Sequence, residues 1–96
     1  MIKVNRKDNI ITISGHANSG EYGKDIVCAA VSSIVYTTIN AIHRIMDNAI
    51  EVQDESTMEI KVLMNDEIVN DLIENMFDLL KDLEKDYPKN LIVKES

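Results

Sequence analysis

Apolar and polar residues alternate in two short segments at the start of the chain, residues 2–5 and 10–14. A two-residue period is typical of a β-strand with one buried face. Residues 6–9 between the segments are polar and suit a turn, so the pattern predicts a β-hairpin. The apolar positions of the two predicted strands are Ile2, Val4, Ile11 and Ile13.

From residue 26 to about residue 50 the apolar positions recur at helical spacing and cover most of the circumference. A helix that is apolar on most sides is normally buried on more than one of them, so we expect it at the centre of the fold, at an oligomer interface, or partly at both. Its main stripe is Val27, Val31, Ile34, Val35, Ile42, Ile45 and Ala49.

The second half of the chain predicts a strand, a helix and a last strand. Residues 57–64 alternate like a strand, Asn65 or Asp66 can cap a helix with an acidic outer face, and Pro88 closes that helix before residues 91–93. The order β-β-α-β-α-β predicts an α+β sandwich with a mixed sheet and two helices, a single domain over residues 1–96.

Composition narrows the functional class. Ninety-six residues are enough for one core without disulfides, and a single cysteine can form none within the chain. No secretory segment precedes the first strand, and no apolar run approaches ~18 residues without polar interruption, so we expect a cytoplasmic protein. The net charge of -7 argues against direct binding to nucleic acid and suits a basic partner, although acidity also simply maintains solubility.

Candidate chemistry lies between Gly15 and Ser32, which hold the only cysteine, Cys28, and one of the two histidines, His16. A thiol attacks as thiolate, which a helix N-terminus or a nearby imidazole stabilises. With Asp25 as N-cap, Cys28 falls in the first turn of the long helix. A short loop, residues 18–24, can bring the two side chains together; its predicted substrate-contacting residues are Gly20, Tyr22 and Gly23.

Several of these residues also have an ordinary structural interpretation. A lone cysteine beside small apolar residues is often just a buried hydrophobe. Asp25 is either the helix cap or a carboxylate that orients His16, and Ser32, one turn beyond Cys28, either packs or hydrogen-bonds near the site. His43 has no nucleophile in its sequence context and is expected at the surface or an interface. The spacing of histidines and cysteine predicts no metal site and no cofactor.

Two blocks of the sequence resemble a known family. Gly15-His16-Ala17 and residues 25–32, Asp-Ile-Val-Cys-Ala-Ala-Val-Ser, with the Tyr22-Gly23 pair between them, are similar to the ribosomal-processing cysteine protease (Prp) family. The resemblance spans essentially the whole chain, although the C-terminal half matches only in pattern. It implies a catalytic dyad of Cys28 and His16.

The same resemblance implies a small homodimer that removes a short N-terminal extension from large-subunit ribosomal protein twenty-seven, cutting after an aromatic pair and before alanine. That substrate is strongly basic, which suits the acidic chain. The alternative is a non-catalytic binding or assembly factor for ribosomal proteins, with Cys28 buried and His16 as a loop anchor.

Overall fold

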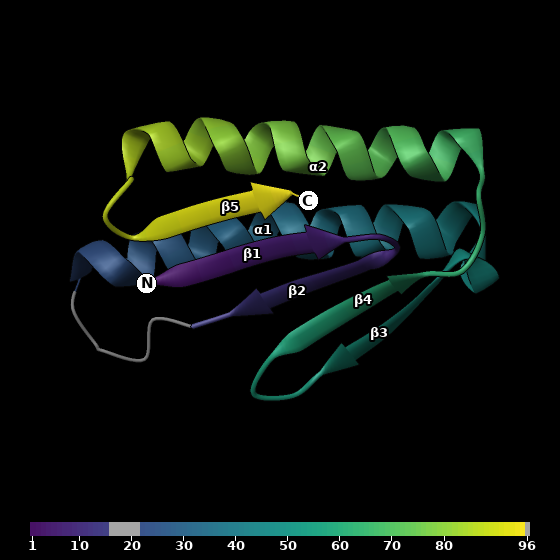
Figure 1. Cartoon of the computed structure of the whole chain (residues 1–96), viewed down its shortest axis with the longest axis horizontal. Coiled ribbons are helices and arrows are strands. Elements are labelled where there is room, and N and C mark those ends of the chain that lie inside the picture. Colours follow the sequence, from purple (N-terminus) through teal and green to yellow (C-terminus); the bar gives the residue numbers. More distant parts are fainter. Residues whose placement is uncertain (16–21, 96) are drawn as a thin grey trace.

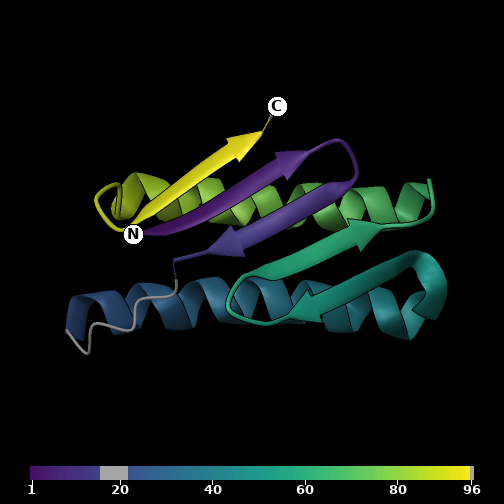
Figure 2. The same ribbon diagram turned by 60° about the horizontal axis from the view of Figure 1, so that its bottom comes forward.

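The computed structural model describes the backbone of residues 1–15 and 22–95, and the side chains of residues 1–15 and 26–95. Two long helices lie side by side on one face of a five-stranded sheet (Figures 1 and 2). The elements are β1 (Ile2–Lys7), β2 (Ile10–Ser14), α1 (Tyr22–Ile45), the short 3-10 helix η1 (Asp47–Ala49), β3 (Ile50–Asp54), β4 (Met58–Val62), α2 (Glu67–Asp86) and β5 (Leu91–Glu95).

The strand order is β3-β4-β2-β1-β5. β1 pairs in parallel with β5 and the other neighbours are antiparallel, so the predicted mixed sheet is confirmed. The predicted hairpin is present, and its turn places Asp8 in the left-handed region with φ 55°. Alternation also sets the faces as expected: Val4 and Ile13 are buried beneath the helices, whereas Lys3 and Lys7 are exposed on the open face.

The first helix was predicted to end about five residues too late, and one strand was missed. α1 ends at Ile45, and residues 50–54 form β3, which pairs with β4 at the edge of the sheet. Ala49 and Ile50 are apolar because they are buried in η1 and β3. Their positions in the sequence also fit the helical spacing, so the predicted helix was extended over them. Asp47 and Asn48, at the point where α1 gives way to η1, are residue types of low helix propensity.

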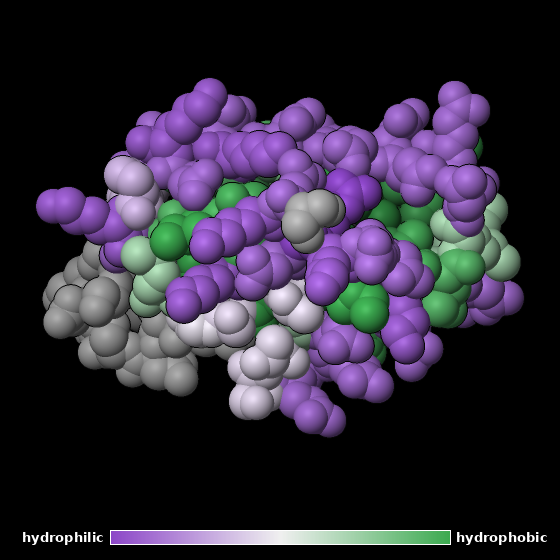
Figure 3. All heavy atoms as spheres, in the orientation of Figure 1, coloured by the Kyte–Doolittle hydropathy of each residue, from purple (hydrophilic) through white to green (hydrophobic). Residues whose placement is uncertain are grey.

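α2 covers the sheet beside β1 and β5. Asp66 is its N-cap, as one of the two predicted candidates, and its Oδ1 accepts from the backbone N–H groups of Ile68 and Val69 at 2.9 and 3.0 Å. Phe77 is fully buried, and the Arg6 guanidinium lies 5.2 Å from the centre of its ring. The outer face is acidic as predicted, and hydrophilic side chains cover this side of the molecule (Figure 3).

Residues Ile26–Ile45 of α1 are long and apolar enough to cross a membrane by length and composition, with a mean hydropathy of 1.5. The central helix of a soluble protein passes the same test, and in this fold Val27, Val31 and Val35 are packed into the core between the sheet and α2. The predicted apolar helix is therefore a core element on one side, and its other side is exposed.

Candidate active site

Cys28 lies in the second turn of α1. The helix already begins at Tyr22, so the expectation that Asp25 caps it and that Cys28 falls in its first turn is wrong. Asp25 is the fourth residue of the helix, and Tyr22 and Gly23 are helical instead of belonging to the predicted substrate loop. A glycine in the first turn interrupts few helical hydrogen bonds, because the first N–H groups have no partner within the helix.

The thiol of Cys28 is free and half-buried, in contact with the edge of the core. Its neighbours at helical spacing are Ser32 and Tyr36, one and two turns further along the same flank of α1. Ser32 is half-buried and Tyr36 is 40% exposed. A cysteine on the border between core and surface is accessible to a substrate, which a fully buried one is not.

His16 and Gly20 lie outside the described residues, so the predicted dyad stays a prediction. The residue before the histidine, Gly15, is described and follows β2 directly. Its φ of +76° favours glycine, and an added Cβ would lie 2.1 Å from the backbone oxygen of Met1. The chain therefore leaves β2 toward His16 through a position that admits no side chain.

A small apolar notch lies beside Ser32, between α1 and the strands β2 and β4. Its floor is buried core: Ile13 faces Met58 across the β2–β4 pair, and Val31 and Val35 close it from the helix. Ser32 and Tyr36 form its rim. The space for the centre of a water molecule is only about 10 Å³, which is room for about one.

Tyr36 closes the far end of the notch and is held there by β3. Its hydroxyl donates a hydrogen bond to Oδ2 of Asp54, the last residue of the strand. This hydrogen bond raises the pKa of Tyr36, with smaller contributions in the same direction from burial and from the negative charge of Asp54. Sequence reasoning missed the notch, and the only signal in the chain was the spacing of Cys28, Ser32 and Tyr36.

The second histidine has a local role. Nδ1 of His43 lies 3.2 Å from both the backbone oxygen and Oδ1 of Asp47, where α1 meets η1. In residues 1–15 and 22–95 no group of three or more histidine, cysteine and acidic side chains is placed to hold a metal ion. His43 therefore belongs to the end of the helix, and the expectation that it is not catalytic stays a prediction.

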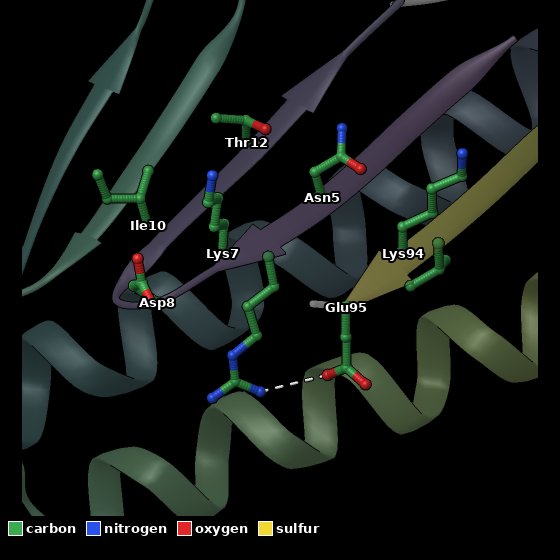
Figure 4. A pocket seen from close by; sticks show the side chains of 9 residues that line it. Asn5, Lys7, Asp8, Ile10, Thr12, Lys94 and Glu95 are labelled. Carbon is green, nitrogen blue, oxygen red and sulfur yellow. Dashed lines mark hydrogen bonds and ion pairs between the residues drawn. The ribbon is translucent and has the colours of Figure 1, made fainter.

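A hollow larger than the notch lies elsewhere among the described residues, at the β1 and β5 side of the sheet (Figure 4). Asn5, Lys7 and Thr12 line it, together with Lys94. Glu95 turns the other way, toward α2, where it pairs with Arg6 and, at 2.6 Å, with Lys81. No cysteine or histidine is among the described lining residues, so they provide neither a thiol nor an imidazole.

The sequence and the fold both match known proteases. Residues 1–92 match the family described as cysteine protease Prp. The ribosomal processing cysteine protease Prp of Bacillus subtilis is 30% identical over 89 residues, 84% of this chain and 80% of that protein. The Mycoplasma genitalium protein of the same name is 53% identical over 36 residues, 38% of this chain and 36% of that protein.

Solved structures agree with the sequence matches. A crystal structure of SMU.848 from Streptococcus mutans has a TM-score of 0.85 and 30% identity, and the match covers 98% of this chain and 90% of that one. The ribosomal processing protease Prp from Staphylococcus aureus, solved in complex with a substrate peptide, has the same fold with a TM-score of 0.86 at 22% identity, covering 99% and 97%.

A two-layer α+β fold with a lone, half-buried thiol near the start of a central helix, in a chain whose relatives are named cysteine proteases, defines a cysteine-type peptidase. The chain belongs to the Prp family of cysteine proteases.

Proposed function

We propose that the chain is a cytoplasmic endopeptidase that removes the N-terminal extension of large-subunit ribosomal protein twenty-seven, cutting after an aromatic pair, with Cys28 as nucleophile and His16 as its base. The observation that carries this proposal is the half-buried free thiol near the start of α1. The names of the relatives support processing of a ribosomal protein, and the Staphylococcus aureus relative has been solved with a covalently linked product peptide.

The reaction proceeds in two displacements. His16 takes the proton of the Cys28 thiol, and the thiolate adds to the carbonyl carbon of the scissile bond. Free N–H groups in the first turn of α1, residues 22–25, are candidates to hold the oxyanion. His16 then protonates the leaving amine as the C–N bond breaks, and water hydrolyses the thioester to release the acid and restore the thiol.

The charge of the chain suits this substrate. α2 exposes carboxylates along one side, which attract a basic polypeptide over a Debye length of about 8 Å at physiological salt. We expect the apparent rate of association with the substrate to fall as salt is raised. The exposed acidic residues of this helix include Glu67, Asp71, Glu74, Asp78 and Asp82.

We further propose a homodimer that forms on the exposed side of α1. No charged residue occurs between Asp25 and Arg44, and the exposed positions there include Ala29, Ser33 and Thr37. Small uncharged side chains allow a second copy to approach closely. Sedimentation velocity at several concentrations tests this: Ser33→Lys should sediment as a monomer where the wild type sediments as a dimer, and an unchanged sedimentation coefficient would exclude this surface.

The decisive experiment is incubation of the purified chain with full-length large-subunit ribosomal protein twenty-seven in reductant, with products read by mass spectrometry. We expect one cut, absent with Cys28→Ala and slower by about 10²- to 10⁴-fold with His16→Ala. Cys28→Ala removes little volume and should lower the free energy of unfolding by only about 1 kcal/mol. Asn75→Ala, on the exposed face of α2, is the control and should cut normally.

No cut by the wild-type chain would favour a non-catalytic binding factor. Alkylation separates that case independently, because an activated thiol reacts with iodoacetamide faster than a free thiol does below neutral pH. If Cys28→Ala still cuts the substrate, the assignment of Cys28 as the nucleophile is refuted.

A further inference from the structure

The flank of α1 that carries Cys28 continues into the apolar notch described above. Cys28, Ser32 and Tyr36 follow one another at intervals of four residues, so they form one ridge along the helix. With a rise of 1.5 Å per residue, Tyr36 lies about 12 Å along the axis from Cys28. An extended peptide covers that distance with about four residues.

We infer that the notch between α1, Ile13 and Met58 receives an apolar side chain of the substrate close to the scissile bond, and that Tyr36 is the wall that limits the size of that side chain. This inference rests on the proposed function. It adds a specificity site to it, at residues that take no part in bond cleavage.

The composition of the notch determines what it can bind. The floor consists of hydrocarbon, from Ile13, Val31, Val35 and Met58, each 3% exposed or less. A charged side chain placed there would lose its hydration with no partner on the floor, whereas an aliphatic or aromatic side chain gains from burial. Among the described lining residues, the polar side-chain groups are the hydroxyls of Ser32 and Tyr36 at the rim, where Ser32 can reach the peptide backbone.

The hydrogen bond to Asp54 makes Tyr36 a defined wall. An exposed tyrosine on a helix normally samples several rotamers, but this one is anchored to the end of β3. The anchor keeps the ring over the far end of a notch that has room for about one water molecule. A side chain larger than that space has to displace the ring, so the Tyr36–Asp54 contact sets the cost of accepting it.

The experiment uses peptides that cover the cut site of large-subunit ribosomal protein twenty-seven. Each of the two residues on either side of the cut is replaced in turn by Ala, Leu, Phe or Asp, and kcat/KM is measured. For one position we expect the wild-type chain to prefer apolar residues to Asp by at least about tenfold. Tyr36→Ala should raise the ratio of kcat/KM for the Phe peptide to kcat/KM for the Leu peptide at that position by about tenfold. The corresponding ratios at the other positions should stay unchanged.

Two variants separate the ring from its anchor. Tyr36→Phe keeps the ring and loses the bond to Asp54, so it should shift the ratio in the same direction by a smaller factor. Tyr87→Ala is the control, because Tyr87 is 37% exposed after the end of α2 and is not among the described residues that line the notch, so it should change no ratio.

The same preferences can be measured without turnover. Dissociation constants of the peptides are determined for Cys28→Ala and for the double variant Cys28→Ala/Tyr36→Ala, and their ratios are compared. If the peptides bind with the expected ratios of dissociation constants but the wild-type chain cuts none of them, the protease assignment is refuted and the inference about the notch stands. If Tyr36→Ala and the wild type cut the peptides with identical ratios of kcat/KM, the inference about the notch is refuted and the protease assignment stands. A wild-type chain that neither binds nor cuts any peptide overturns both.

Discussion

Replacement of Gly15 by alanine tests how the fold places the segment that carries His16. Gly15 has a φ of +76°, and an alanine Cβ would lie 2.1 Å from the backbone oxygen of Met1, whereas ordinary contacts begin at 3.4 Å. The first residue would have to move by more than 1 Å. Met1 is exposed, but Ile2 behind it is buried and its N–H donates to the backbone oxygen of Asn90 at 2.9 Å.

The cost has two parts. A non-glycine residue in the left-handed region costs about 1 kcal/mol, and weakening the bond from Ile2 to Asn90 costs about another 0.5–1.5 kcal/mol. A loss of about 2 kcal/mol corresponds to a decrease of about 8–16 °C in Tm for a domain of this size. The substitution also changes the backbone of the residue before His16, so under the proposed dyad turnover should fall even where the variant is fully folded.

Thermal unfolding followed by circular dichroism, with peptide cleavage measured well below the transition, checks both effects. Ser14→Ala is the control on the preceding residue and should stay within about 0.5 kcal/mol of the wild type. Gly15→Asn separates the two costs, because asparagine tolerates the left-handed region better than alanine but still brings a Cβ against Met1. A Gly15→Ala variant that melts and cuts like the wild type would refute the reasoning.

Two further predictions concern the second helix and the sheet edge. Asp66→Ala removes the N-cap of α2 and should cost about 0.5–2 kcal/mol in urea unfolding, whereas Asp66→Asn should cost little. The hydrogen bond from Lys81 is the largest of the interactions with Lys81 and Arg6 that lower the pKa of Glu95 below its ordinary value of 4.5. The stability that this pair contributes is therefore present above pH 4.5 and is lost as the pH falls through the lowered value. Glu95→Gln should reduce stability at pH 7 and flatten the decrease in stability below pH 4.5; an unchanged acid profile would show that other carboxylates cause that decrease.

Local sequence patterns predicted most of the fold because they report burial directly. The alternation in β1, β2 and β4 survives in the structure since each strand has one covered face. β3 was not predicted, because its first residue, Ile50, is apolar at a position that also continues the helical spacing of α1. Which of the two periods applies there depends on pairing with β4, a contact between segments that no local pattern reveals.

The site was predictable only in part, for a similar reason. Cys28 stands out as the only thiol, but the notch combines Ile13, Val31 and Met58 from three elements, and nothing in their local sequence connects them. The anchor between Tyr36 and Asp54 depends on β3, the strand that the sequence did not predict. The proposed specificity notch is thus formed by long-range packing, whereas the proposed nucleophile is visible in the sequence itself.

The position of Asp25 inside α1 leads to a last prediction. In a helix, side chains lean toward the N-terminus, so the sulfur of Cys28 lies over the first turn, where the N–H groups of residues 22–25 have no helical partner. A residue within that turn gains nothing from capping ability, and alanine forms helix better than asparagine. Asp25→Ala should therefore be at least as stable as Asp25→Asn in urea unfolding, whereas an N-cap would reverse that order by about 1 kcal/mol. If Asp25 instead orients His16, both variants should lose kcat by orders of magnitude with little change in unfolding. Wild-type turnover in both would leave Asp25 without a catalytic role.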